Sequence, residues 1–199
     1  MSSFDPKFQN TSIDSKIVVA LERISEAFKV LLWKEGKENS LTPIQLQLLL
    51  FVKYHDPKNC KVNYLAKEFN LTKATISESV RLLAKKGYIR KETDPDDTRS
   101  YSIYLTQRGN ALALECSSFA LALERPVELL SASKKEALFD SLLELITKLN
   151  KAGIISVQRM CFSCRFYKKG TEKDYCNFLK KELLKPDIRL DCPEHEILG

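Results

Sequence analysis

Residues 63–106 read NYLAKEFNLTKATISESVRLLAKKGYIRKETDPDDTRSYSIYLT, and the pattern predicts two helices followed by a β-hairpin. Asn63 is suited to cap a short helix over residues 64–69, because its side chain accepts hydrogen bonds from free backbone N–H groups. Asn70 is suited to end that helix in a left-handed conformation. The first of the two helices is therefore short and sharply bounded.

The second helix is predicted to begin after Thr72, which is another good N-cap, and to run to about Lys86. Gly87 stops it, since glycine tolerates the backbone conformation found just beyond helix ends. Two helices joined by a short turn form a helix-turn-helix. The strands of the hairpin are predicted at residues 88–91 and 100–106, with turn chemistry at residues 94–97.

The sequence before this segment predicts two more helices. Residues 13–34 carry apolar side chains at steps of three and four, the period of an amphipathic helix, and Gly36 and Asn39 are expected to break it. Thr42 and Pro43 then begin a helix that runs to about Tyr54. That helix is apolar nearly all round, which predicts a buried central position.

The sequence after the hairpin is helical again from Gln107 to Leu149. Pro126 is expected to kink or break it, since proline cannot donate the backbone hydrogen bond of a helix interior. A second break is expected before Ser133, which with Glu136 forms a capping box.

The helix from Thr72 has the features of a helix that reads DNA. Ile76, Val80 and Leu83 form its inward stripe. The other face carries short polar and charged side chains of the kind that contact base edges and phosphates in the major groove. The candidate DNA-binding residues on this helix are Thr72, Lys73, Thr75, Ser77, Glu78 and Arg81.

The hairpin supplies a second candidate contact. Arg99 lies near its tip, where a cation on a thin loop can enter a narrow minor groove. Asp97 is placed to orient the Arg99 guanidinium through a charge-assisted hydrogen bond.

This order of elements resembles the MarR family of winged-helix regulators over about residues 10–150. The residues that carry the resemblance are Leu41-Thr42-Pro43-Ile44-Gln45, Tyr64-Leu65-Ala66, Thr75-Ile76-Ser77, Val80, Leu82-Leu83, Lys86-Gly87-Tyr88-Ile89, Asp97-Thr98-Arg99 and Leu105-Thr106-Gln107-Arg108-Gly109. The family usually has a basic residue where Thr98 stands, which leaves Arg99 as the cation of the tip.

The resemblance implies a mainly α (α+β) winged helix-turn-helix fold. It also implies a homodimer, with long terminal helices intertwined, that binds a palindromic site on double-stranded DNA. The expected organisation has four parts: an N-terminal dimerisation helix, a DNA-binding domain, C-terminal dimerisation helices and a cysteine-rich tail, at residues 1–40, 41–109, 110–154 and 155–199.

The tail exceeds what such a family core requires, and it holds four of the six cysteines in the spacing C-x2-C-x11-C-x15-C. Four thiolates suit a tetrahedral metal site, and a metal gives a short polar segment a reason to fold. The candidate metal ligands are Cys161, Cys164, Cys176 and Cys192.

Three interpretations of the tail stay open from sequence. The first is structural zinc. The second is a [4Fe–4S] cluster, since Cys192-Pro193 matches the ending of some cluster motifs. The third is metal-free thiols. We expect Cys60 and Cys116 to be packing groups, His55 to have a capping or surface role at a helix end, and His195 to be solvent-exposed.

Composition narrows the class of protein. The net charge is +6, and residues 61–110 hold 10 Lys and Arg against 6 Asp and Glu, so the basic excess lies in the predicted DNA-binding segment. We find no apolar run of membrane length, no secretory signal and no motif of an enzyme active site, which predicts a cytoplasmic protein that is not an enzyme.

The function we expect is sequence-specific transcriptional regulation, modulated by metal or redox state at the four cysteines. A small-molecule effector between the long helices is the other candidate signal. The competing functions are a metal-stabilised protein–protein adaptor without DNA binding and an iron–sulfur redox sensor.

Overall fold

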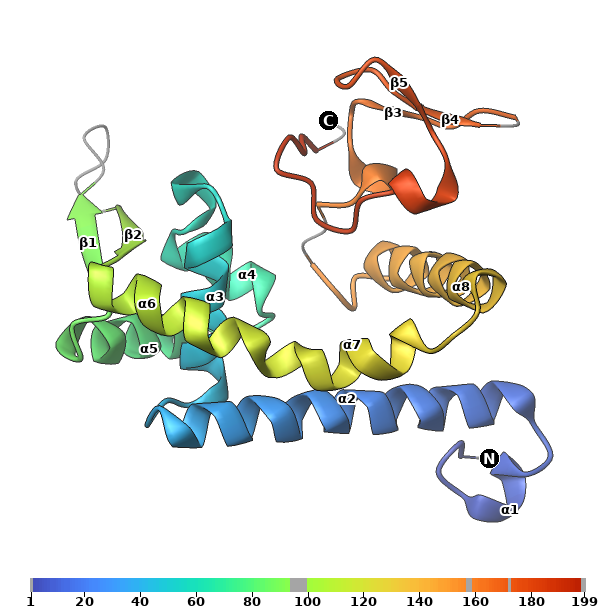
Figure 1. The fold of residues 1–199 in the computed structure, drawn as a ribbon, viewed down its shortest axis with the longest axis horizontal. Coiled ribbons are helices and arrows are strands. Elements are labelled where there is room, and N and C mark those ends of the chain that lie inside the picture. The colour runs from blue at the N-terminus through green and yellow to red at the C-terminus, as the bar shows by residue number, and fades with distance from the viewer. Residues whose placement is uncertain (1, 94–99, 157–158, 172, 198–199) are drawn as a thin grey trace.

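A computed structural model of the chain describes residues 2–93, 100–156, 159–171 and 173–197. The described part is mainly helical, with one two-stranded and one three-stranded sheet (Figure 1). The winged helix-turn-helix lies at one end of the molecule, the long helices extend from it, and the C-terminal sheet lies on the other side of α8 from α2 and α7 (Figure 1).

The N-terminal part has a short helix α1 (Pro6–Gln9), the long helix α2 (Ile13–Glu38) and the central helix α3 (Pro43–Tyr54). A capping box begins α3: Thr42 Oγ1 accepts from the Gln45 N–H, and the Gln45 side chain accepts from the Thr42 N–H. The predicted burial of α3 is confirmed, because Leu46, Leu48 and Leu49 are at most 1% exposed.

The expected break at Gly36 is wrong, because α2 continues through it to Glu38. Gly36 is buried, and a Cβ added there would lie 2.6 Å from the backbone oxygen of Leu41. Glycine at this position therefore serves close packing between α2 and the chain leading into α3, not helix termination.

The helix-turn-helix follows a 3-10 turn, η1 (Pro57–Asn59), and consists of α4 (Val62–Glu68) and α5 (Lys73–Lys85). Asn70 has a φ of 52°, as the predicted left-handed turn requires. The expected cap at Asn63 is wrong: α4 begins two residues earlier than predicted, after Lys61, and no side chain caps it.

The wing is an antiparallel pair of strands, β1 (Ile89–Thr93) and β2 (Tyr101–Leu105), in which Ile89 pairs with Leu105. Gly87, with a φ of 74°, turns the chain from α5 into β1. Ile103 packs into the main core with side chains from α3, α4 and α5, and burial of each such side chain contributes about 1.5–3 kcal/mol to stability. The fully buried members of this core include Leu46, Leu48, Leu49, Leu65, Ile76, Val80, Leu83 and Ile103.

The helical region after the wing is divided differently from the prediction. It comprises α6 (Gln107–Cys116), the 3-10 turn η2 (Ser117–Ala120), α7 (Leu121–Glu128) and α8 (Ala132–Lys151). Pro126 lies inside α7, which ends two residues later. The expected cap at Ser133 is wrong, because α8 starts after Ser131, and Ser131 itself makes no capping hydrogen bond.

The long helices expose an unusual amount of apolar surface. On α2, side chains of the predicted amphipathic stripe are 41–54% exposed (Ile17, Leu21, Ile24 and Phe28), and on the C-terminal side Leu129 is 88% exposed. None of the helices in the described ranges is long and apolar enough to cross a membrane.

The C-terminal segment folds as a three-stranded sheet of order β3 (Tyr167–Lys168), β4 (Asp174–Cys176) and β5 (Lys181–Leu183), with 3-10 turns η3 (Cys161–Ser163) and η4 (Lys185–Asp187). Although this segment is short and polar, it shares a small core with α8. The members of that core include Leu143, Met160, Leu183 and Ile188.

Candidate nucleic-acid interface and four-cysteine pocket

The N-terminal end of α5 is built by local hydrogen bonds. Thr72 Oγ1 accepts from the Thr75 N–H at 3.1 Å and lies 2.9 Å from Thr75 Oγ1. Both hydroxyls therefore help to fix the helix start, and a role of either in reading DNA remains a prediction.

The two faces of α5 are sorted as the sequence predicted. Ile76, Val80 and Leu83 are at most 1% exposed. Ser79 is buried with them, since its hydroxyl donates to the Thr75 carbonyl at 3.0 Å. The candidate DNA-binding residues lie on the other side, where Lys73, Thr75, Glu78 and Arg81 are exposed and Ser77 is half-buried.

Glu78 and Arg81 form a two-pronged ion pair. Arg81 Nε and Nη2 donate to the two Glu78 oxygens at 2.8 and 2.6 Å. This hydrogen bonding lowers the pKa of Glu78 and raises the pKa of Arg81. Because both side chains are exposed, the pair itself stabilises the fold little, but it holds the guanidinium in one place on the helix surface.

A broad groove runs beside α5, with a volume of about 680 Å³. Side chains from α4, α5, β2 and the turn before α4 line it: Lys58, Lys61, Val62, Asn63, Tyr64, Lys67, Lys73, Ser77, Ser100 and Tyr101. Two predicted residues, Lys73 and Ser77, are among them. Sequence reasoning missed Lys58, Lys61 and Lys67, although the basic excess of residues 61–110 pointed to this region.

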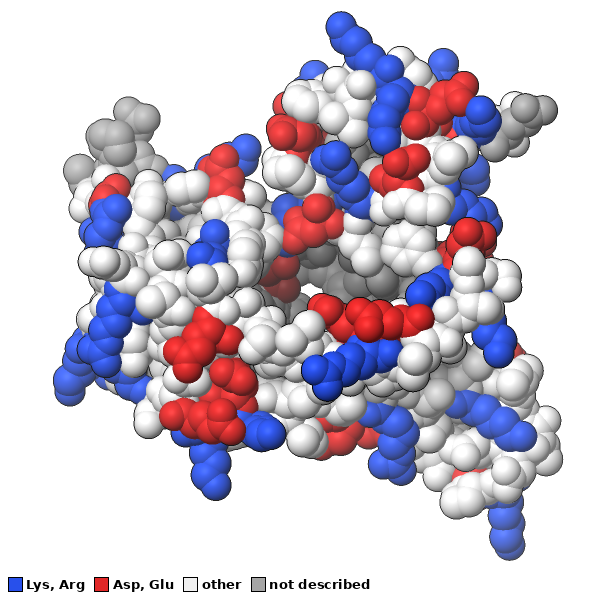
Figure 2. All heavy atoms as spheres, viewed as in Figure 1, with Lys and Arg blue, Asp and Glu red and all other residues white. Residues whose placement is uncertain are grey.

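The base of the wing is also basic. Arg90 lies over the Tyr104 ring at 4.8 Å and Lys91 over the Tyr101 ring at 4.6 Å. Figure 2 shows that Lys and Arg predominate along the edge formed by α5 and β1, whereas basic and acidic residues are mixed over the rest of that face. The predicted tip residues Asp97 and Arg99 lie outside the described residues.

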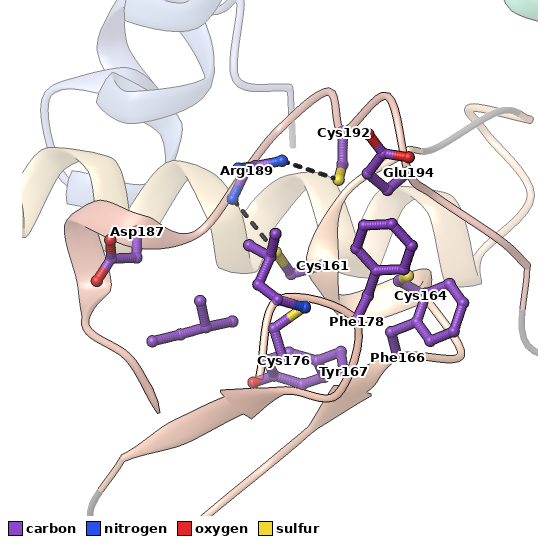
Figure 3. A pocket seen from close by; sticks show the side chains of 12 residues that line it. Cys161, Cys164, Phe166, Tyr167, Cys176, Phe178, Asp187, Arg189, Cys192 and Glu194 are labelled. Atoms are coloured by element: carbon purple, nitrogen blue, oxygen red, sulfur yellow. Dashed lines mark hydrogen bonds between the residues drawn. The ribbon is translucent and has the colours of Figure 1, made fainter. Parts of the chain in front are cut away.

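The four tail cysteines line one pocket (Figure 3). Cys161 and Cys164 come from η3 and its end, Cys176 ends β4, and Cys192 lies in the final loop. We call Cys161, Cys164, Cys176 and Cys192 the four-cysteine cluster. The pocket encloses a cavity of about 20 Å³, and its other lining is largely apolar, with Phe166, Tyr167, Phe178, Leu179 and Leu183.

Hydrogen bonds from N–H groups point at three of the sulfur atoms. The Arg189 N–H donates to Cys161 Sγ at 3.3 Å, Arg189 Nη1 to Cys192 Sγ at 3.5 Å, and the Leu179 N–H to Cys176 Sγ at 3.5 Å. Donors of this kind surround metal-bound cysteines, where they orient the ligand and tune the metal.

Burial raises the pKa of Cys161, and the negative charge that thiolates at Cys192, Cys176 and Cys164 would bring raises it further. Four thiols gathered in this way cannot ionise together without a cation. Within the described ranges, however, no three His, Cys, Asp or Glu side chains are spaced so that they could hold a metal ion. Four cysteines are the ligands of a zinc site, but their side chains are not spaced as in a site that holds a metal ion. The metal therefore remains a prediction.

The remaining predicted residues have clear positions. Cys60 and Cys116 are at most 1% exposed, which confirms their packing role. His55 caps the C-terminal end of α3 as predicted, because its N–H donates to the Phe51 carbonyl and its Nδ1 lies 2.8 Å from the same oxygen. It also stacks on the Phe51 ring, with ring centroids 3.8 Å apart, and contacts the tail. His195 is half-buried, not solvent-exposed, and lies 3.0 Å from the Ser163 hydroxyl.

Part of the chain is similar in sequence to known proteins. Residues 39–100 match the model of the MarR family. A 52-residue stretch is 33% identical to the HTH-type transcriptional regulator BilQ of Clostridioides difficile; it covers 26% of this chain, and the chain spans only 35% of that relative's length.

Solved structures cover more of the chain. The S. aureus MepR–DNA complex is 26% identical and has a TM-score of 0.59, over 66% of this chain and 97% of MepR. Streptococcus pneumoniae FabT in complex with DNA, at 21% identity, has a TM-score of 0.58 over 69% of this chain and 97% of FabT, and its likeness concerns the fold alone. The chain therefore has the winged helix-turn-helix fold of MarR regulators, and these matches leave the function of the tail open.

Proposed function

We propose that this chain, with its MarR family segment and winged-helix fold, is a sequence-specific DNA-binding transcriptional regulator. The observation that carries the proposal is the groove of about 680 Å³ beside α5, where four lysines from three neighbouring segments converge. The likeness to MepR in complex with DNA supports it. In this function α5 enters the major groove, and the lysines neutralise the phosphates on either side.

Different side chains are proposed to contact phosphates and bases. Lys73 and its neighbours in the groove contact phosphates, which gives affinity without sequence information. Thr75, Ser77 and Arg81 face base edges with hydroxyl or guanidinium donors, which gives sequence preference. Arg81 leaves its ion pair with Glu78 to make such a contact, at a small cost because the pair is exposed.

The proposed functional unit is a homodimer. The exposed apolar stripe of α2, together with exposed side chains on α7 and α8, needs a partner, and a second copy of the same chain offers the same surface for mutual burial. A two-fold pair of recognition helices then reads an inverted repeat.

DNA binding is tested by fluorescence anisotropy with a duplex enriched from a random-sequence library. We expect binding that weakens steeply as salt rises. Joint replacement of Lys73→Glu and Arg81→Glu should abolish it while the circular dichroism spectrum stays unchanged. DNA binding that survives the charge reversal would place the DNA-contacting surface elsewhere, and a wild-type chain that binds no duplex would instead favour the adaptor.

We further propose that the four-cysteine cluster takes one zinc ion per chain. Four thiolates are a structural zinc shell, and the N–H donors to three sulfurs suit bound thiolates. A cavity of about 20 Å³ accommodates one water-sized occupant, which fits a single ion better than four irons and four sulfides. The sulfur atoms must turn toward the cavity to close the shell.

Anaerobic purification, elemental analysis and an absorption spectrum test the metal. A colourless protein with one zinc per chain is expected, and a zinc content near zero after Cys176→Ser. A brown protein that contains iron would contradict zinc and favour a [4Fe–4S] cluster. A native protein without metal would contradict both and favour free thiols. We propose that metal binding at the four-cysteine cluster changes the affinity for DNA. In this proposal a small molecule between the long helices is not the signal.

A further inference from the structure

One arginine fastens the C-terminal segment to the helix-turn-helix. Arg159 is only 11% exposed at its side chain. Its Nη1 and Nη2 donate to the Glu68 carboxylate of α4 at 2.6 and 3.1 Å. Its Nε and Nη2 donate to the Asp191 carboxylate of the tail at 2.6 and 3.0 Å. The guanidinium thus joins two segments that are far apart in the chain.

Aromatic side chains of α3 and α4 fix the plane of this guanidinium. It lies 5.1 Å from the centre of the Phe51 ring, and Nη1 donates to the Tyr64 hydroxyl at 2.8 Å. His55 stacks on Phe51, with its Nε2 2.7 Å from an Asp191 oxygen. Lysine could not replace Arg159 here, because binding two carboxylates at once requires the planar, forked guanidinium group.

The tail side of the contact is continuous with the four-cysteine cluster. Asp191 directly precedes Cys192, and the Cys192 N–H donates to the Arg159 carbonyl at 2.9 Å. Arg159 itself lies two residues before Cys161, whose N–H donates to the Arg189 carbonyl at 3.2 Å. A movement of Cys161 or Cys192 therefore shifts the groups that hold α4.

The other side of the contact is continuous with the DNA groove. Glu68 and Tyr64 both lie on α4, and Tyr64 and Lys67 line the groove together with Lys73 of α5. Next to them, the Ser156 hydroxyl donates to the Lys67 carbonyl. The position of α4 sets where its lysine stands relative to the recognition helix.

We propose that Arg159 is a positioning residue that transmits the state of the four-cysteine cluster to α4 and so sets the affinity for DNA. The inference rests on the proposed function in that it requires DNA to bind along the groove. An intact cluster presents Asp191 to Arg159 and holds α4 in place, which raises the fraction of molecules competent to bind. A disrupted cluster releases Asp191, and α4 loses its tether.

A double-mutant cycle on DNA affinity tests this inference in the full-length chain. Cys176→Ser disrupts the cluster at a residue that makes no hydrogen bond to Arg159 in the described structure. Fluorescence anisotropy with the library-enriched duplex should show Kd rising at least about fivefold, as typical coupling energies give. In an Arg159→Met background, the same cysteine change should have no further effect.

Arg165→Met is the matched control. Arg165 lies on the same segment and pairs with Glu196 at 2.9 Å, but both side chains are more than half exposed. In this background Cys176→Ser should keep its full effect. Arg159→Lys, which keeps the charge and loses the fork, should recover only part of the coupling.

Additive effects of Cys176→Ser and Arg159→Met would overturn the inference, as would a Cys176→Ser variant with unchanged affinity. If Arg159→Met fails to fold by circular dichroism, the double variant Glu68→Gln, Tyr64→Phe removes the α4 carboxylate and hydroxyl that bind Arg159 while leaving Asp191 in place, and must uncouple the cluster in the same way. A wild-type chain that binds no duplex overturns the proposed function as well, whereas binding with additive effects overturns this inference alone.

Discussion

Replacement of Lys73 by glutamine should change the salt dependence of DNA binding by a calculable amount. Four lysines line the groove of each chain, so the proposed homodimer would offer eight phosphate contacts. Each contact contributes about 0.9 to the slope of log K against log salt, which predicts a slope of about −7 for the wild type. Lys73→Gln removes one contact per chain, and the slope should fall to about −5.5.

The same contacts set the loss of affinity. At 0.15 M salt, release of the counterions of one phosphate contributes about 1 kcal/mol, so the loss of two contacts weakens binding by about 2 kcal/mol, or about 30-fold. Fluorescence anisotropy titrations over a series of potassium chloride concentrations give both quantities. Lys148→Gln is the control, because Lys148 lies on α8 and pairs with Glu144, away from the groove lining.

An unchanged slope for Lys73→Gln would refute the assignment of the groove to phosphate contacts. An equal fall of the slope for Lys148→Gln would refute it too, because the effect would then follow net charge alone.

Three further predictions address the core, the dimer and the packing of α2. Burial raises the pKa of Cys60 and of Cys116 to about 12, so only about one thiol in 10⁴ is ionised at pH 8. Iodoacetamide should leave both unmodified in the native protein and label both after denaturation, as peptide mass spectrometry will show; native labelling would contradict their burial. Phe28→Glu places a charge in the exposed stripe of α2 and should yield monomers by sedimentation, whereas an unaltered dimer would place the interface elsewhere. Gly36→Ala brings a Cβ to 2.6 Å from the Leu41 oxygen and should lower the free energy of unfolding by about 1–3 kcal/mol in urea titrations; a neutral result would mean that the loop yields freely.

The sequence was sufficient wherever local chemistry determines the structure. The period of apolar residues located α5, and Thr72 and Gly87 located its ends. The same holds for α3, whose capping box follows from Thr42 and its neighbours. In each case the deciding residues lie within a few positions of the element that they define.

Two positions were predicted wrongly because their residue types are suited to more than one structural role. Gly36 looks like a helix breaker in isolation, but it is needed for the approach of the Leu41 backbone. Asn63 has the chemistry of a cap, but α4 begins earlier and leaves it inside the first turn. Residue type alone does not decide between such roles.

The contacts of Arg159 could not be found from sequence at all. Its partners Glu68 and His55 are 91 and 104 residues away, and nothing in the local pattern around Arg159 distinguishes it from a surface cation. The four-cysteine spacing did indicate a common site, because thiols at such spacing have few other roles outside disulfides. Its link to the helix-turn-helix emerges only from the folded chain.

Selection from a random-sequence duplex library, followed by sequencing of the bound fraction, tests the central claim most directly. A two-fold pair of chains that each insert α5 into the major groove should enrich an inverted repeat whose half-site centres lie about 10 base pairs apart. A library that shows no enrichment, or that yields a single unrepeated motif, would contradict the account.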